Sequence, residues 1–499
     1  MQKAMRAALI GAAAALWACG GTSAPAVPTD TGGGGTTGSV TAGSSASAST
    51  GTTGIQASGS TASSASGSTG STSSSTSSSG STGGSTTGVT TGPGPWPTQA
   101  LTQYGPAQGL TEPLVDVSTD EAQNIWAVSS DALYVMRPGD TAFRRYTDAD
   151  GLHIANSTYP GVMNVAGGKP GEAFVGYNGA EWENGSPQVT GDPSIDAVLN
   201  EGGIDHVQLN ADGTLTVIHP DIHSNDYVVG SETDFSFKED RSTRRMLYDH
   251  YFHDGTLYIG WNHGVSRFDW AKTDPTTGSN FADHVHPIVT STASDGTVTE
   301  WMGEWRGLAL DPAHDGMLWM GGQYTGGALA WTPTLYGWTC QRADCANGGN
   351  PFVHAWAMAW GGPLFPVSHD GDSMNIRGVA VTHDGTAYFA SGPQWNPGVD
   401  HMYGVAVVKP EGVTYLDPGA DLHLPSNYLM DVVAMPDDTL VFAVMGNGLF
   451  RYNPQTGQTA QMAGVPGDVN LIYLDKMVEP AALYAATGEG IFVVRDQPK

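Results

Sequence analysis

The residue types best suited to ligand chemistry gather around position 300 of the chain. Glu300, Trp301, Glu304, Trp305 and Arg306 lie in one short stretch that is flanked by polar residues. An exposed tryptophan stacks on sugar rings or apolar groups, while carboxylates and a guanidinium orient a polar ligand. We therefore predict that this stretch is partly exposed and contributes to a ligand-binding site.

Two further tryptophans and one further arginine are expected on the same side of the fold. The predicted ligand-binding residues are Trp261, Glu300, Trp301, Trp305, Arg306, Arg377 and Trp395. For any single tryptophan taken by itself a structural role is favoured, because these large rings also fill the space between packed repeats.

Acid/base chemistry is the alternative use of the titratable groups in this region. A propeller enzyme, such as a lyase or hydrolase acting on a glycan or a small cyclic substrate, would draw on His250, His263, Glu300, Glu304 and His401. Such an enzyme needs these groups to converge within hydrogen-bond reach of a substrate. The binding interpretation, which we favour, requires no catalytic residue.

Metal and cofactor chemistry find little support in the motifs. The histidines occur as His250 with His253, as His284-Val-His286, and as His219 with His223, and none completes an HExxH motif. The sequence also lacks G-x-S-x-G, P-loop and dinucleotide-binding motifs. We expect no bound metal and no cofactor.

The three cysteines have separate roles. Cys340 and Cys345 are too far apart for a CxxC metal pair, and no second pair accompanies them. In an exported protein a disulfide between Cys340 and Cys345 is the favoured interpretation, with two buried thiols as the alternative.

Residues 1–19 have the features of an export signal. Lys3 and Arg6 precede an apolar run that is too short to span a bilayer. Leu16-Trp-Ala-Cys19 resembles the lipobox of bacterial lipoproteins, which implies that Cys19 is lipidated and anchors the chain in the membrane; a plain cleaved signal is the alternative. Gly20 in the following position implies sorting to the outer membrane of the cell envelope.

Residues 20–97 are almost entirely glycine, serine and threonine. Such a segment has too few apolar side chains to offset the entropy of ordering, so we expect a disordered tether. The formal net charge of −29, with no cluster of Lys or Arg, excludes nucleic acid as an expected partner.

A repeated unit of four short strands begins after the tether. Leu429–Met462 contains three apolar or alternating runs and a weaker fourth, separated by turn residues. Seven copies of the unit can be counted in residues 98–499, and the shortest approach the ~40–45 residues of a propeller blade. The predicted fold is therefore an all-β, seven-bladed β-propeller.

The two ends of this domain complement each other. The last copy ends after its third strand, Gly490–Arg495, whereas an additional strand-like segment, Ala100–Leu110, precedes the first copy. Ala100–Leu110 resembles Arg144–Leu152, the fourth strand of the first copy. We predict that this N-terminal strand completes the last blade and closes the ring.

The repeats resemble the two-component regulator propeller repeats, which are related to WD/YVTN-like propellers. Tyr146–Leu152, Asn124–Val128, Gly255–Gly260 and Gly316–Gly321 show the pattern best. The resemblance implies a propeller and a sensing role, often in a chain that also carries a membrane helix and a kinase. No such segment is visible here, so an accessory sensor for a separate membrane kinase is a further alternative.

The turns and insertions are distributed unevenly. Connections from the first to the second strand of each copy are short, as in His253-Asp-Gly255 and His383-Asp-Gly385, whereas most insertions fall in the connections at the other end. Binding residues concentrate on loops that a rigid scaffold presents. We therefore predict a membrane-anchored propeller that binds a small molecule, a glycan or a protein on its loop-bearing face.

Overall fold

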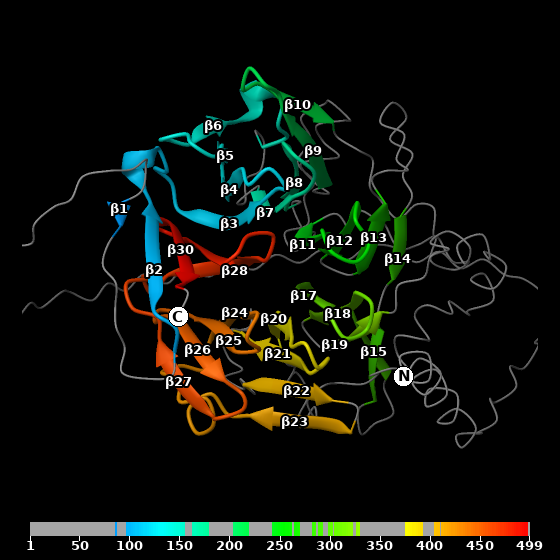
Figure 1. Cartoon of the computed structure of the whole chain (residues 1–499). Coiled ribbons are helices and arrows are strands. Elements are labelled where there is room, and N and C mark those ends of the chain that lie inside the picture. The colour runs from blue at the N-terminus through cyan, green and yellow to red at the C-terminus, as the bar shows by residue number, and fades with distance from the viewer. Residues whose placement is uncertain are drawn as a thin grey trace, which may run out of the picture. The chain divides into compact units, whose positions relative to one another are not determined.

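The computed structural model of the chain consists of two units, residues 1–81 and 82–499. All described residues belong to the second unit (Figure 1). The described ranges are 85–86, 96–154, 162–178, 203–218, 242–261, 264–269, 282–285, 288–292, 298–302, 304–322, 326–329, 375–392, 404–409 and 411–497. Cys19, Cys340 and Cys345 lie outside them, as do Trp395, His263 and His401.

The second unit is an all-β propeller built from antiparallel sheets of consecutive strands. The first three blades are β3 (Leu114–Thr119), β4 (Ile125–Ser129), β5 (Leu133–Met136) and β6 (Arg144–Tyr146); β7 (Val162–Gly167), β8 (Glu172–Tyr177), β9 (Gly203–Leu209) and β10 (Leu215–Ile218); and β11 (Thr243–Asp249), β12 (Thr256–Trp261), β13 (Val265–Asp269) and β14 (Ala282–Val285).

Three more blades follow in the C-terminal half. They are β20 (Ile376–Val381), β21 (Ala387–Ser391), β22 (Val405–Lys409) and β23 (Gly412–Leu416); β24 (Leu429–Ala434), β25 (Leu440–Val444), β26 (Gly448–Asn453) and β27 (Gln458–Gln461); and β28 (Val469–Asp475), β29 (Ala482–Thr487) and β30 (Gly490–Asp496) with β2 (Gln99–Tyr104) and β1 (Ser85–Thr86).

The prediction of seven complete blades is wrong for the described residues. They form six sheets of four or more strands, together with a three-stranded sheet and a two-stranded hairpin. The three-stranded sheet is β17 (Trp305–Asp311), β18 (Met317–Gly322) and β19 (Gly326–Leu329), and the hairpin is β15 (Ile288–Thr292) with β16 (Val298–Met302). The fourth repeat thus has no fourth strand in the part of the chain described, although its sequence pattern matches the other copies.

The predicted closure by an N-terminal strand is confirmed. β2 pairs antiparallel with β30 from Gln99↔Asp496 to Tyr104↔Ile491, so the strand order of this sheet is β1-β2-β30-β29-β28. A short 3-10 helix, Pro106–Gln108, follows β2 just as a second one, Asp148–Asp150, follows β6. Each ends at a glycine with positive φ, Gly109 at 88° and Gly151 at 96°, where a side chain would be strained. The segments Ala100–Leu110 and Arg144–Leu152 therefore resemble each other in structure as well as in sequence.

The first strands of the repeats form the inner wall of the ring. Each contacts the next in the cyclic order β3, β7, β11, β17, β20, β24, β28 and back to β3. Neighbouring first strands run in the same direction and in matched register, since Asp116 accepts a hydrogen bond from Val165 N and Ser118 from Gly167 N. All first strands therefore begin on one side, here named the start face, and end on the other, the turn face.

Every first strand has a bulge at its second residue. The pairing with the second strand shifts register there in β3, β7, β11, β17, β20, β24 and β28. A bulge leaves one residue without a cross-strand partner and changes the direction of its side chain. The second residue of each first strand is consequently released from the blade at the start face.

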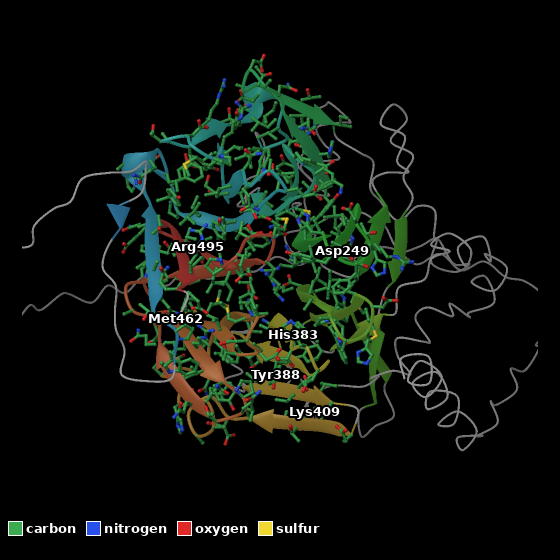
Figure 2. All side chains as sticks on the ribbon, viewed as in Figure 1. Asp249, His383, Tyr388, Lys409, Met462 and Arg495 are labelled. Atoms are coloured by element: carbon green, nitrogen blue, oxygen red, sulfur yellow. The ribbon has the colours of Figure 1, made fainter. Side chains whose placement is uncertain are left out.

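The core lies between neighbouring sheets, where apolar side chains fill the space from both sides (Figure 2). One cluster joins the last blade to the first, and its members include Leu114, Tyr134, Tyr484 and Ile491. Burying such side chains contributes about 1.5–3 kcal/mol each. Both faces of a blade are therefore covered, which is why most strand residues are buried.

Among the described residues, no helix is both long and apolar enough to cross a membrane.

Candidate ligand-binding site

Three arginines meet at the start face, and each is the second residue of its first strand. Arg244 belongs to β11, Arg306 to β17 and Arg377 to β20, which are successive strands of the ring. The bulge at each position explains why these charged side chains leave the blade instead of packing within it.

Glu304 is the carboxylate that brings the arginines together. Its Oε1 lies 2.9 Å from a terminal nitrogen of Arg244, and its Oε2 accepts a hydrogen bond of 2.8 Å from Arg306 Nε. A terminal nitrogen of Arg306 also donates to Oε2. We name Arg244, Glu304, Arg306 and Arg377 the arginine cluster. Among its own members the positive charges exceed the negative by two.

The charges in the arginine cluster act strongly on one another. Burial alone would raise the pKa of Glu304, but the adjacent Arg306 and Arg244 lower it to about 2, so the carboxylate is ionised at neutral pH. Burial and the positive charges of Arg306 and Arg244 lower the pKa of Arg377 to about 9, against the opposing effect of Glu304. Burial and the close approach of like charges thus act together on the pKa values of the arginine cluster.

The structure brings together three residues singled out from the sequence, Glu304, Arg306 and Arg377. It adds Arg244, which the sequence analysis missed. The available signal was the basic pair Arg244-Arg245 at the beginning of an otherwise apolar strand. Glu300 and Trp301 lie in β16, opposite Thr290 and Val289 of β15.

The expected exposure of Trp261 and Trp305 is wrong. Trp261 is 2% exposed and packs with Phe174 and Ile259, while its indole nitrogen donates to Ser266 Oγ at 2.7 Å. Trp305 is fully buried in the neighbouring core cluster. Both side chains fill the space between sheets, the structural role that tryptophan commonly takes in packed repeats.

A second polar group lies deeper in the ring, around Arg245. This guanidinium, on β11, lies 3.0 Å from Asp431 Oδ2 on β24 and donates to the carbonyl oxygen of Ile472 on β28. Both partners belong to blades that are not adjacent to the third blade in the cyclic order. Arg245 therefore crosses the axis of the ring and ties opposite sides of its wall together.

Aspartates at equivalent places link neighbouring first strands. Asp116 accepts hydrogen bonds from Val117 N and Val165 N, and Asp431 accepts them from Val432 N and Ile472 N. Burial raises the pKa of Asp116 to about 6, although Arg245 opposes the shift. The sequence signal for this role was the aspartate in the otherwise apolar runs around positions 116 and 431, and we did not identify it.

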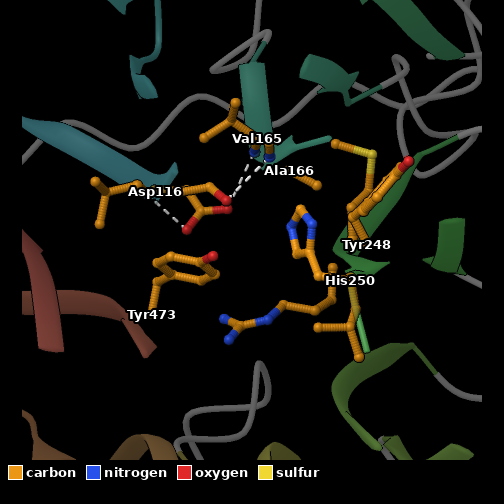
Figure 3. Close-up of a pocket in the computed structure, with 12 residues that line it drawn as sticks. Asp116, Val165, Ala166, Tyr248, His250 and Tyr473 are labelled. Atoms are coloured by element: carbon orange, nitrogen blue, oxygen red, sulfur yellow. Dashed lines mark hydrogen bonds between the residues drawn. The ribbon is translucent and has the colours of Figure 1, made fainter. Parts of the chain in front are cut away.

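A cavity of about 40 Å³ lies beside this group (Figure 3). We name it the channel pocket; its polar lining residues are Asp116, Ser118, Arg245, Tyr248, His250 and Tyr473. Figure 3 shows Asp116, His250 and Tyr473 pointing toward one another across it.

The groups proposed for acid/base chemistry do not converge among the described residues. His250 follows the end of β11 and lines the channel pocket, whereas Glu304 precedes β17 at the start face. These two groups lie at opposite ends of adjacent first strands, and Glu304 is already held as an anion by two arginines.

Of the histidines considered for metal binding, His253 is held by an aspartate of its own turn, as is His314 in the next repeat; the side chains of His219, His223, His284 and His286 lie outside the described part of the chain. His253 Nδ1 lies 3.1 Å from Asp249 Oδ2 within one turn, and His314 Nδ1 lies 2.8 Å from Asp311 Oδ2 in the equivalent turn of the next repeat. Within the described ranges, no group of three or more His, Cys, Asp or Glu side chains is arranged to hold a metal ion.

Comparisons with known proteins found similar folds at low identity. No family model and no curated protein matches the chain. A streptogramin B lyase is similar at 12% identity and a TM-score of 0.42, covering 80% of this chain and 98% of its own. YCF48 bound to D1 peptide is similar at 14% identity and a TM-score of 0.43, and the match covers 78% of this chain and 93% of that one.

The extracellular domain of a hybrid two-component system from B. thetaiotaomicron is similar at 12% identity and a TM-score of 0.32, covering 80% of this chain and 48% of that one. Each TM-score is below 0.5, so the propeller assignment rests on the strand pairing described above. The chain is an all-β propeller that carries a partly buried arginine cluster on its start face.

Proposed function

We propose that this chain is a binding module of the cell envelope that holds an anionic group of its ligand at the arginine cluster. The observation that supports this function is the gathering of Arg244, Arg306 and Arg377 around the single carboxylate of Glu304. Guanidinium groups bind carboxylate and phosphate with paired hydrogen bonds, and they do so more strongly where water is largely excluded.

The place of the arginine cluster in the fold fits this role. It lies where first strands begin, and the connections that carry most of the insertions in this sequence reach the same face. An incoming carboxylate or phosphate would place acceptor oxygens beside three guanidinium groups, which gives binding a favourable electrostatic contribution.

We further propose how the module reaches its ligand. Residues 1–19 act as a lipoprotein signal, Cys19 carries the lipid, residues 20–97 form the tether, and a Cys340–Cys345 disulfide stabilises an insertion of the domain 98–499. The lipobox and the composition of the tether support this arrangement. At ~5–6 Å × √n, a tether of roughly 75 residues spans about 45–50 Å and holds the propeller clear of the membrane.

The test is a binding screen of the purified protein against glycans and peptides, each presented with and without acidic groups. We expect the acidic members to bind, and we expect Arg306→Ala and Arg377→Ala each to weaken binding by at least tenfold, because each removes a charge-assisted hydrogen-bond donor.

The matched control is Arg145→Ala. Arg145 is an arginine in a surface ion pair with Glu112, remote from the cluster, and its loss should leave affinity unchanged. If neutral and acidic ligands bind equally well, or if Arg145→Ala weakens binding as much as Arg306→Ala, the proposed site is wrong.

A further inference from the structure

The channel pocket is separate from the arginine cluster. Its lining comes from the middle and the ends of β3, β7 and β11, from His250 just beyond β11, and from Tyr473 in β28. The cluster lies instead at the beginnings of β11, β17 and β20. Arg245, which bridges to Asp431, lies between the two along β11, so the pocket belongs to the turn-face half of the ring.

The pocket presents an unused hydrogen-bonding nitrogen. The side chain of His250 is only 5% exposed, yet its Nδ1 has no hydrogen-bond partner; the nearest carboxylate oxygen, on Glu121, is 3.7 Å away. Burial lowers the pKa of His250 despite the opposing effect of Glu121, so the ring is neutral at pH 7. A neutral imidazole has one nitrogen able to accept a hydrogen bond. A buried group left without a hydrogen bond is destabilising, and a bound donor would remove that cost.

Two other acceptors face the same cavity. Each carboxylate oxygen of Asp116 accepts one backbone N–H and retains capacity for a further hydrogen bond. The hydroxyl of Tyr473 accepts from Thr119 Oγ1 at 3.3 Å. Asp116, His250 and Tyr473 thus offer acceptors from three directions (Figure 3).

The surroundings of the pocket are mainly acidic and aromatic, and the one arginine in its lining, Arg245, is paired with Asp431. Glu121 and Asp249 adjoin His250, and Asp475 accepts from Thr119 beside Tyr473. The rings of Tyr248 and Tyr251 lie 4.7 and 6.1 Å from the imidazole of His250. Acidic and aromatic groups together favour a positively charged ligand.

We propose that the channel pocket binds a primary ammonium group. An ammonium has three donors, which match the three acceptors, and its charge complements the acidic surroundings. A cavity of about 40 Å³ admits this group with one or two attached carbons and excludes a larger headgroup. A carboxylate would instead face Asp116 and Glu121 and be repelled.

The ammonium can come from a free small amine or from a lysine side chain of a partner protein. On the turn face, Tyr251 is 49% exposed and Phe252 is 37% exposed, next to the residue that lines the pocket. Such exposed aromatic rings can cover the carbon chain of either source.

The test is calorimetric titration of the full protein at pH 7 with methylammonium chloride and, separately, with a short neutral peptide that contains one lysine. We expect saturable binding, and we expect His250→Phe and Tyr473→Phe each to weaken it by tenfold or more. The same peptide with acetylated lysine is the matched ligand control and should not bind. Circular dichroism would verify that both variants are folded.

The outcomes separate the two sources. Binding of methylammonium, with or without binding of the peptide, supports a free amine, and binding of the peptide alone supports a partner's lysine. If neither probe binds, or if folded His250→Phe and Tyr473→Phe leave the binding unchanged, the proposal is overturned. Arg306→Ala, which affects the arginine cluster alone, should bind methylammonium normally, so this result is independent of the function proposed for the start face.

Discussion

The direction in which an arginine side chain points in this propeller depends on the position of the residue along the first strand. At the second position the bulge directs Arg244, Arg306 and Arg377 outward to the start face, where they surround Glu304. At the third position the same residue type turns inward, and Arg245 spans the ring to reach Asp431. One step along the strand therefore separates an arginine at the start face from an arginine that links strands across the ring.

Asp116 should make the stability of the propeller depend on pH. Its pKa in the folded state, about 6, lies above the ordinary value of 3.8, so the folded protein retains this proton to a higher pH than the unfolded chain does. The contribution is fully present below pH 3.8 and is lost as the pH rises through 6. Relative to Asp116→Asn, the free energy of unfolding of the wild type should increase by about 2–3 kcal/mol between pH 7 and pH 4.

Urea denaturation across this pH range measures the effect. The cost of replacing one carboxylate oxygen by an amide group is the same at every pH and cancels in the comparison. Asp131→Asn, at an exposed aspartate, is the matched control. A difference between wild type and Asp116→Asn that stays constant with pH would contradict the prediction.

The strands were predictable from the sequence, but the exposure of their residues was not. Alternating apolar residues bounded by turn residues placed the paired strands of every repeat, including Leu429–Ala434 with Leu440–Val444. Because neighbouring sheets cover both faces of a blade, alternation along a strand does not distinguish buried from exposed positions. Trp305 accordingly lies in the core although Glu304 and Arg306, on either side of it, reach the start face.

The candidate site was predictable only in part for a related reason. Glu304, Arg306 and Arg377 attracted attention by residue type, but Arg244 is distant in sequence and joins them only through the order of strands in the ring. Asp116 and His250 meet in the channel pocket for the same reason. Contacts between repeats depend on how the first strands of different repeats are aligned in the ring, and the sequence pattern within one repeat does not specify this alignment.

The closing strand β2 should contribute strongly to stability. Leu101 is 7% exposed and packs with Leu449, Met462 and Phe492 between the last two blades. Leu101→Ala removes this packing and should lower the free energy of unfolding by about 2–5 kcal/mol, as measured by urea denaturation. Gln103→Ala, at a less buried polar position of the same strand, is the control and should cost much less. Equal, small effects of both would show that β2 is dispensable.

At the scale of the whole molecule, the ring joins sheets that are far apart in sequence. The last blade takes its outer strand from the beginning of the domain, and Arg245 connects the third blade to Asp431 across the axis. Loss of one blade would therefore disturb several others. We expect residues 98–499 to unfold as one cooperative unit rather than blade by blade.

The proposed anchor gives a prediction at this scale. Cys19→Ser removes the thiol that would carry the lipid, and membrane attachment by acyl chains depends on that bond. After cell breakage and centrifugation, the wild type should sediment with the membranes and the variant should not. Cys340→Ser, which leaves the lipobox intact, should remain with the membranes. Equal distribution of wild type and Cys19→Ser would refute lipid anchoring.

The position of β2 between the two-residue strand β1 and β30 has a mechanical consequence. The chain that precedes Trp96 continues directly into this strand, whose bonds to the rest of its sheet run between Gln99–Tyr104 and Ile491–Asp496. Once the two-residue pairing of β1 with β2 has opened, any tension transmitted along the N-terminal segment is therefore borne by the ladder between β2 and β30. Under force the propeller should part at this seam, releasing an N-terminal strand while the remaining sheets are still folded.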